Sequence, residues 1–287
     1  MGILTLENVS YVYSPSTPFE KEALHDVNID FTEGKITGII GHTGSGKSTV
    51  AQLLNGLLKP ASGKVLLDGC DIFDPSVKLS DVRFRVGLVF QYPEYQLFEE
   101  TVFRDIAFGP TNMGLDEAEI KRRVIESARF AGLDEELLGR SPFELSGGQK
   151  RRAAIAGVMA MEPEVIVLDE PAAGLDPRGR DEILSGIRRY RDEKGNTVIL
   201  ISHSMEDMAL YSDELVVMSR GTVLVSGTVD EVFRQSALIE ESGLTLPQIT
   251  RVFDRLRADG VNIRDGVYTV EDGYREMLSL LKGNTNA

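Results

Sequence analysis

A glycine-rich stretch near the N-terminus has the residue types and spacing of a phosphate-binding loop. Residues 41–48 are Gly-His-Thr-Gly-Ser-Gly-Lys-Ser, which fits the pattern G-x-x-x-x-G-K-[ST]. The glycines allow successive backbone N–H groups to point inward as an anion nest. Lys47 can reach the β- and γ-phosphates, and the Ser48 hydroxyl can coordinate a Mg²⁺ ion that bridges them. We therefore expect a nucleotide site, with no chemistry assigned to the His42 side chain, formed by Gly41, His42, Thr43, Gly44, Ser45, Gly46, Lys47, Ser48 and Thr49.

Three more side chains with suitable chemistry follow apolar runs later in the chain. Asp169 and Glu170 come directly after Val165–Leu168, a predicted buried strand, and open α/β sheets bind ligands at such strand ends. Asp169 can hold Mg²⁺ through its water shell, and Glu170 can polarise the attacking water as a general base. His203 follows the run Val198–Ser202, which we expect to lie beside the other two strands of the site, so that His203 could reach a γ-phosphate. A single histidine after a strand is, however, more often a surface residue.

A second predicted anion site lies at residues 145–149, Leu-Ser-Gly-Gly-Gln. Ser146 is a good N-cap, and Gly147 and Gly148 leave backbone N–H groups exposed at the start of a helix that continues from Gln149. One γ-phosphate does not need two complete cradles within one chain. We therefore expect residues 146–149 to serve a nucleotide held by another subunit.

These candidate residues require strands whose ends meet. Short apolar runs separated by helical patterns predict a parallel sheet covered by helices on both faces. The predicted strands of this sheet are Ile36–Ile40, Val86–Phe90, Val165–Leu168 and Thr197–Ile201, and the predicted helices are Lys47–Leu58, Glu117–Phe130, Gln149–Met161 and Arg178–Glu193.

The two ends of the chain have different patterns from this core. Further strands are expected at Ile3–Tyr13, Asp26–Phe31 and Lys64–Asp68, and a hairpin over Leu215–Ser226 that turns at Arg220-Gly221. After about residue 240 the pattern changes to a small α-rich appendage, with helices expected at Pro247–Ala258 and Thr269–Leu281.

Composition restricts the class of protein. The chain has 287 residues, 42% of them hydrophobic, which excludes a disordered chain and a disulfide scaffold. Its single cysteine suits a reducing compartment, and the start of the chain lacks the features of a signal peptide. The longest stretch without a charged residue, Asn8–Phe19, is too short to span a bilayer. The net charge of −14 disfavours nucleic acid as a partner.

With these motifs the sequence resembles the ATP-binding cassette (ABC) ATPases. The resemblance covers roughly residues 3–235 and implies an ATPase that uses ATP and Mg²⁺. Its motifs correspond to the Walker A loop Gly41–Ser48, the Q-loop residue Gln91, the signature Leu145–Gln149, the Walker B strand Val165–Asp169 with Glu170, the D-loop around Asp176 and the switch residue His203. It implies catalytic roles for Glu170, His203 and Gln91, Mg²⁺ ligands in Ser48, Gln91 and Asp169, and adenine stacking by Tyr13, with Tyr11 as the rival residue.

A narrower match follows Gln91. Residues 90–102, Phe-Gln-Tyr-Pro-Glu-Tyr-Gln-Leu-Phe-Glu-Glu-Thr-Val, are similar to the ATPases of energy-coupling factor (ECF) transporters, which import vitamins and transition-metal ions, and look more like the second ATPase of the heterodimeric pair. This resemblance implies an α/β P-loop fold with a mostly parallel core sheet, an antiparallel β subdomain and a helical signature subdomain at about 92–160. It divides the chain into a nucleotide-binding domain, 1–240, and a C-terminal extension, 241–287, that dimerises.

The ECF resemblance also implies the partners. They are a second ABC ATPase subunit, identical or paralogous, a transmembrane coupling subunit and a membrane subunit that captures the substrate, so the chain would sit peripherally on the cytoplasmic face of the cell membrane. The alternative is a soluble ABC ATPase of DNA repair or translation. Those proteins carry long inserts or two cassettes in one chain, and this chain has one copy of each motif.

One surface is predicted from charge. Residues 91–136 contain 11 acidic and 5 basic side chains, which is complementary to the basic cytoplasmic loops of membrane proteins. We expect Tyr92–Phe98 to line a groove for a cytoplasmic helix of the membrane partner, with Glu94 pairing an arginine of that helix. A solvated acidic helix face is the simpler interpretation of such a charge excess.

Overall fold

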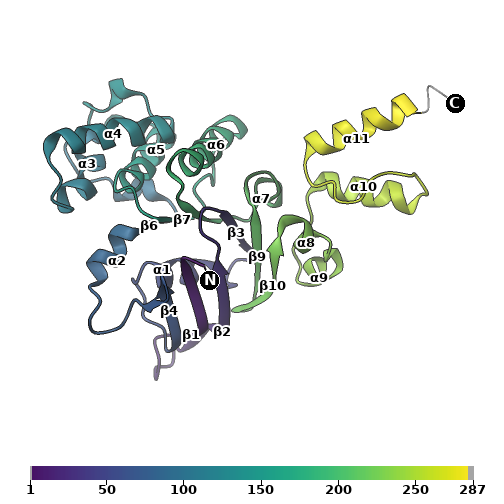
Figure 1. Cartoon of the computed structure of the whole chain (residues 1–287), viewed down its shortest axis with the longest axis horizontal. Coiled ribbons are helices and arrows are strands. Elements are labelled where there is room, and N and C mark those ends of the chain that lie inside the picture. Colours follow the sequence, from purple (N-terminus) through teal and green to yellow (C-terminus); the bar gives the residue numbers. More distant parts are fainter. Residues whose placement is uncertain (1, 284–287) are drawn as a thin grey trace.

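Two β-sheets lie at the centre of the computed structural model, which describes residues 2–283 (Figure 1). Helices α3, α4 and α5 gather at one end of the molecule, and α10 and α11 lie at the other. Met1 and residues 284–287, the outermost parts of the two predicted domains, lie outside the described residues.

The larger sheet has six strands in the order β10-β9-β3-β8-β7-β6. Their bounds are β3 Ile36–Gly41, β6 Val86–Val89, β7 Val165–Asp169, β8 Thr197–Ile201, β9 Glu214–Ser219 and β10 Thr222–Thr228. All neighbours pair in parallel except β9 and β10, which form the edge hairpin. The predicted parallel sheet is therefore confirmed.

Both faces of the sheet are buried at β3, β7 and β8, which explains why these strands are mostly apolar. In β3, Ile36 and Ile40 pack into one core cluster, and Ile39, whose side chain points to the opposite face, packs into the other. Both clusters continue through the alternating residues of β7 and β8. Because β3, β7 and β8 are parallel neighbours, their carboxyl ends lie at one edge of the sheet, and this edge carries the candidate site residues.

The second sheet is antiparallel, with strand order β2-β1-β4-β5, as expected for the β subdomain. Its strands are β1 Leu4–Tyr13, β2 Lys21–Phe31, β4 Ser62–Leu67 and β5 Cys70–Asp71. Strand β2 begins five residues before the predicted Asp26, because residues 21–24 pair with the end of β1. This pairing places Lys21 opposite Tyr13.

The helices lie mainly where the sequence predicts them. Helix α1 ends at Leu54 and not at Leu58, since Gly56 adopts a left-handed turn with φ +68°. Helices α2 and α3 were not predicted, and α3 contains Gly109 and Pro110, which ordinarily indicate a break. The helices as far as α7 are α1 Lys47–Leu54, α2 Leu79–Arg85, α3 Val102–Asn112, α4 Glu117–Ala131, α5 Gly147–Met159, α6 Pro177–Lys194 and α7 Met205–Tyr211, with short 3₁₀ turns at Pro93–Gln96, Glu135–Leu137 and Pro142–Glu144.

The C-terminal part begins with the predicted hairpin, whose turn residues Arg220 and Gly221 both have positive φ. It continues through α8 Val229–Phe233, α9 Ser236–Glu241, α10 Gln248–Ala258 and α11 Val270–Gly283. A small apolar cluster of its own, centred on Phe253, Ile263 and Val267, holds α10 and α11 together. None of the helices within residues 2–283 is long and apolar enough to cross a membrane.

Candidate nucleotide-binding site

The glycine-rich loop leaves β3 and enters α1, the arrangement that presents backbone N–H groups to an anion. Gly44 and Gly46 have φ of +82° and +105°, conformations that favour glycine. The Lys47 ammonium lies inside the curl and donates to the carbonyl oxygens of Gly41 (2.6 Å) and His42 (3.0 Å). Burial lowers the pKa of Lys47, although nearby carboxylates oppose this effect. The loop therefore holds the Lys47 cation at a position where a phosphate could bind.

The predicted carboxylates lie beside this loop at the end of β7. Asp169 is buried; burial raises the pKa of Asp169, while the neighbouring Ser48 hydroxyl and the charge of Lys47 oppose the rise. Glu170 has φ +54°, and its N–H donates to the carbonyl oxygen of Ile201 at 3.0 Å. This bond fixes the turn where the chain leaves the sheet.

His203 reaches the same place from the end of β8. Its Nδ1 lies 2.9 Å from both carboxylate oxygens of Glu170. The histidine side chain is 69% exposed and the glutamate side chain 12% exposed, so His203 covers Glu170 on its solvent side. The strand before His203 was expected beside the other two strands of the site, and β8 indeed pairs directly with both β3 and β7.

A cavity of about 280 Å³ joins these groups to Tyr13. Tyr13 donates to or accepts from the Thr49 hydroxyl at 3.1 Å, whereas Tyr11 packs against the core. The lining also includes Lys21 and Ala23 of β2, which the sequence reasoning missed because no motif marks them. The lining residues are Tyr13, Lys21, Ala23, Thr43, Gly44, Gly46, Lys47, Ser48, Thr49, Gln91, Asp169 and Glu170.

A second cavity, of about 600 Å³, opens on the other side of Lys47 and Glu170. Gln91 and His203 line it, and so do residues from the segment after α9, Gly243, Leu244 and Thr245. This segment was expected only as the start of the C-terminal extension; no site residue was predicted in it, because no motif marks it.

The second predicted anion site lies at the start of α5, and its residues line neither cavity. Ser146 and Gln149 form a reciprocal capping box: the Gln149 N–H donates to Ser146 Oγ at 3.3 Å, and the Ser146 N–H donates to Gln149 Oε1 at 2.9 Å. Ser146 and Gly147 are exposed, and none of residues 146–149 lines the cavities around Lys47.

Comparison with known proteins agrees with this geometry. The family model described as "ABC transporter" matches residues 24–173. The chain is 53% identical to the energy-coupling factor transporter ATP-binding protein EcfA2 of Caldanaerobacter subterraneus subsp. tengcongensis, over 99% of both chains. It is 51% identical to the protein of the same name from Clostridium perfringens, over 98% of this chain and 99% of the relative.

The chain belongs to the energy-coupling factor ATPases of the ABC transporter family. Among solved structures, cbiO1 from Clostridium perfringens, part of the ABC transporter complex cbiONQ, superimposes with a TM-score of 0.74 at 41% identity, covering 88% of this chain and 99% of that one. A dimeric ATP-binding cassette in a post-hydrolysis state with ADP and Pi gives a TM-score of 0.71 at 28% identity, covering 79% and 98%.

The expectation for Glu94 is wrong. Its carboxylate is not available to an arginine of a membrane partner, because Arg151 of α5 in the same ECF ATPase chain holds it with two hydrogen bonds of 3.0 and 2.8 Å. Tyr92, Tyr95 and Phe98 of the predicted groove are exposed. The internal ion pair formed because folding brings α5 against the Pro93–Gln96 turn.

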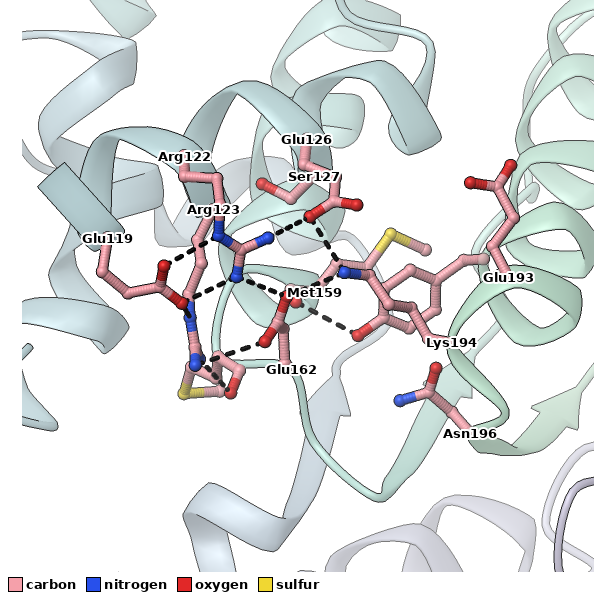
Figure 2. Close-up of polar contacts among 12 residues, drawn as sticks. Glu119, Arg122, Arg123, Glu126, Ser127, Met159, Glu162, Glu193, Lys194 and Asn196 are labelled. Carbon is pink, nitrogen blue, oxygen red and sulfur yellow. Dashed lines mark hydrogen bonds and ion pairs between the residues drawn. The ribbon is translucent and has the colours of Figure 1, made fainter.

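Some of the acidic residues farther along this stretch are also paired internally. Figure 2 shows Glu119 and Glu126 of α4 bound to Arg122 and Arg123, with Lys194 and Glu162 completing the network. The network connects α4 to the end of α6 and to the loop before β7. Part of the acidic excess therefore serves the packing of the helical region.

Proposed function

We propose that this chain is the ATP-hydrolysing subunit of an energy-coupling factor importer and powers the uptake of vitamins or transition-metal ions through membrane partners. The observation that carries the proposal is the meeting of Lys47, Asp169, Glu170 and His203 at one sheet edge. The transport role is supported by the similarity to energy-coupling factor transporter ATP-binding proteins and to cbiO1, part of an ABC transporter complex.

Nucleotide would lie along the cavity from Tyr13 to Glu170. Tyr13 stacks on adenine at the open end, the N–H groups of residues 43–49 bind the phosphates, and Lys47 exchanges its two carbonyl partners for phosphate oxygens.

The oxygen ligands beside Lys47 suit Mg²⁺. The Ser48 hydroxyl, the buried Asp169 carboxylate and the Gln91 side chain line the same cavity. Mg²⁺ keeps several waters and takes only one or two protein carboxylates plus phosphate oxygens, so this small set fits it. When bound, the ion would neutralise charge on the β- and γ-phosphates.

Glu170 is the proposed general base. Its carboxylate faces the cavity beyond Lys47, where it can accept a proton from the water that attacks the γ-phosphate. His203 orients this carboxylate through Nδ1 and, being exposed, can also reach the γ-phosphate. Gln91, which lines both cavities, would help to position the water.

The exposed start of α5 supports a head-to-tail dimer. Since Ser146, Gly147, Gly148 and Gln149 face neither cavity of their own chain, we propose that they complete the site of a second ATPase, identical or paralogous. Residues 241–287 would add a second contact between the two chains. The pair would act peripherally at the cytoplasmic face of the membrane, bound to a coupling subunit and a substrate-capture subunit.

A dimer assembled from two differently tagged copies tests this arrangement. Ser146→Arg in one copy and Lys47→Ala in the other fall in the same site, so one complete site remains and ATP turnover persists. The matched control carries both substitutions in one copy beside a wild-type copy, which damages both sites and abolishes turnover. The head-to-tail proposal is wrong if the two mixed dimers have equal activity.

A further inference from the structure

The segment 242–248, which leads from α9 into the C-terminal helices, is tied to the glycine-rich loop. The His42 Nε2 atom lies 2.7 Å from the carbonyl oxygen of Ser242. A carbonyl can only accept, so Nε2 carries the hydrogen and donates. Ser242 is the C-cap of α9, where the last carbonyl groups lack partners within the helix. His42, to which the sequence assigned no chemistry, supplies one such partner from 200 residues away.

Gly243 makes this approach possible. It has φ +80°, and a Cβ atom at this position would lie 3.0 Å from His42 Nε2. Both the backbone conformation and the close contact with the imidazole therefore favour glycine. The backbone turn that ends α9 therefore allows the contact between His42 and Ser242.

The far end of the segment is hydrogen-bonded to helix α7, which begins two residues after His203. The N–H of Gln248, the first residue of α10, donates to Glu206 Oε1 at 3.3 Å. Glu206 lies in the first turn of α7, three residues after His203. Between the two ties, Leu246 is buried in the main core. The segment is therefore held at both ends and in the middle.

One tie ends in the glycine-rich loop, and the other ends in the first turn of α7, three residues after His203. The His42 carbonyl oxygen accepts from Lys47, so a phosphate that takes the ammonium removes a bond from the His42 peptide. His203 is bonded to Glu170, and Leu244 in the segment lines the cavity that both residues face. A ligand in this cavity changes the surroundings of both ties at once.

We propose that His42 and Glu206 are positioning residues that couple the nucleotide site to the C-terminal helices through segment 242–248. Nucleotide binding shifts the segment and α10, and a contact made by α10 and α11 changes nucleotide affinity by the same factor, because coupling between two sites is reciprocal. The inference rests on the proposed nucleotide site and adds to it a route by which the state of that site reaches the extension.

Hydrogen–deuterium exchange on the full-length chain measures the coupling directly. The wild-type protein is compared without nucleotide and with a non-hydrolysable ATP analogue plus Mg²⁺, following the amides of residues 242–258. We expect the analogue to change exchange across this region. His42→Ala should speed exchange at the segment by about three- to tenfold, the range for one lost hydrogen bond, and should reduce the response to the analogue.

Two matched pairs of variants separate positioning from general damage to the loop. The amide nitrogen of His42→Gln can occupy the place of Nε2 and should restore the response, whereas that of His42→Asn reaches only the place of Nδ1 and should not. Glu206→Gln keeps an acceptor for the Gln248 N–H, and Glu206→Ala removes it. Glu206 lies outside the glycine-rich loop, so this pair tests the proposal even if substitutions of His42 disturb folding.

Binding of a fluorescent ATP analogue is measured in parallel on each protein. If the wild type binds the analogue but exchange in the extension does not change, the coupling is refuted while the nucleotide site stands. Equal responses in His42→Gln and His42→Asn, or in both Glu206 variants, would also refute it. A wild type that binds no analogue would overturn the nucleotide site and the coupling with it.

Discussion

The ion pair between Glu94 and Arg151 is a buried connection whose removal should be costly. Arg151 is 4% exposed, and its Nε and Nη2 donate to the two Glu94 oxygens at 3.0 and 2.8 Å. Its Nη1 also donates to the carbonyl oxygen of Ala173, in the loop that follows Glu170. One guanidinium therefore joins the segment after Gln91, the helix that begins at the signature and the loop after the proposed base.

The loss of stability can be worked out from this geometry. Glu94→Ala leaves a buried guanidinium with one carbonyl partner, and removing one member of a buried pair costs about 3–5 kcal/mol. The Glu94 side chain is 14% exposed, so water can enter and the cost should be near the lower end, about 3 kcal/mol. Glu94→Gln keeps a neutral acceptor and should cost about half as much, close to one charged hydrogen bond of about 1.5 kcal/mol.

The matched control is Glu100→Ala. Glu100 pairs with Arg104 within the same stretch, but both side chains are largely exposed, so its removal should cost about 0–0.5 kcal/mol. Urea unfolding followed by circular dichroism compares the variants at constant m-value. If Glu94→Ala unfolds at the same urea concentration as Glu100→Ala, the assignment of a structural role to this pair is refuted.

The same pair predicts a dependence on pH. Burial tends to raise the pKa of Glu94, but the hydrogen bonds and charge of Arg151 outweigh it and hold this pKa below its usual range. A lowered folded-state pKa means that the stabilisation is complete above the unfolded-state pKa of about 4.3 and is lost as pH falls through the folded-state value. The stability gap between wild type and Glu94→Gln should therefore be full at pH 7 and close in acid. A gap that widens below pH 4 would contradict this sign.

Substitutions at three further residues test the proposed site and the ion-pair network of the helical region. Glu170→Gln should retain ATP binding and reduce turnover by about 10²- to 10⁴-fold, because the amide cannot accept the proton of water; near-normal turnover in the assembled dimer would remove Glu170 from the role of base. Tyr13→Ala should weaken ATP binding by about 1–3 kcal/mol, as for lost base stacking, while Tyr13→Phe, which loses only the bond to Thr49, should bind nearly normally in a calorimetric titration. Glu162→Gln removes charge from a partly exposed network with Arg122 and should lower the thermal midpoint by only a few degrees; an unchanged midpoint would show that the network adds nothing measurable.

The sequence by itself determined the motifs and most of the core. The loop 41–48 and the strand ending at Asp169 are recognisable because the residues that give the loop its chemistry, and those that make the strand buried, are consecutive in the sequence. A strand covered on both faces reads as a nearly continuous apolar run, so β3, β7 and β8 were predicted nearly to the residue. The parallel order of these strands then brings their ends, and the polar residues after them, to one edge.

Tertiary structure alone decided which distant side chains meet. Arg151 pairs with Glu94, which is 57 residues away in the sequence, so the Glu94 charge does not face a partner as expected. His42 donates a hydrogen bond to the carbonyl oxygen of Ser242, which is 200 residues away. Neither contact has a local signature, because a hydrogen bond depends on where packing places its two atoms and not on the residues beside them. Lys21 lines the cavity beside Lys47 for the same reason, because strand pairing places it opposite Tyr13. Short sequence motifs therefore identify the chemical groups of this protein, and the contacts between those motifs form only when the chain folds.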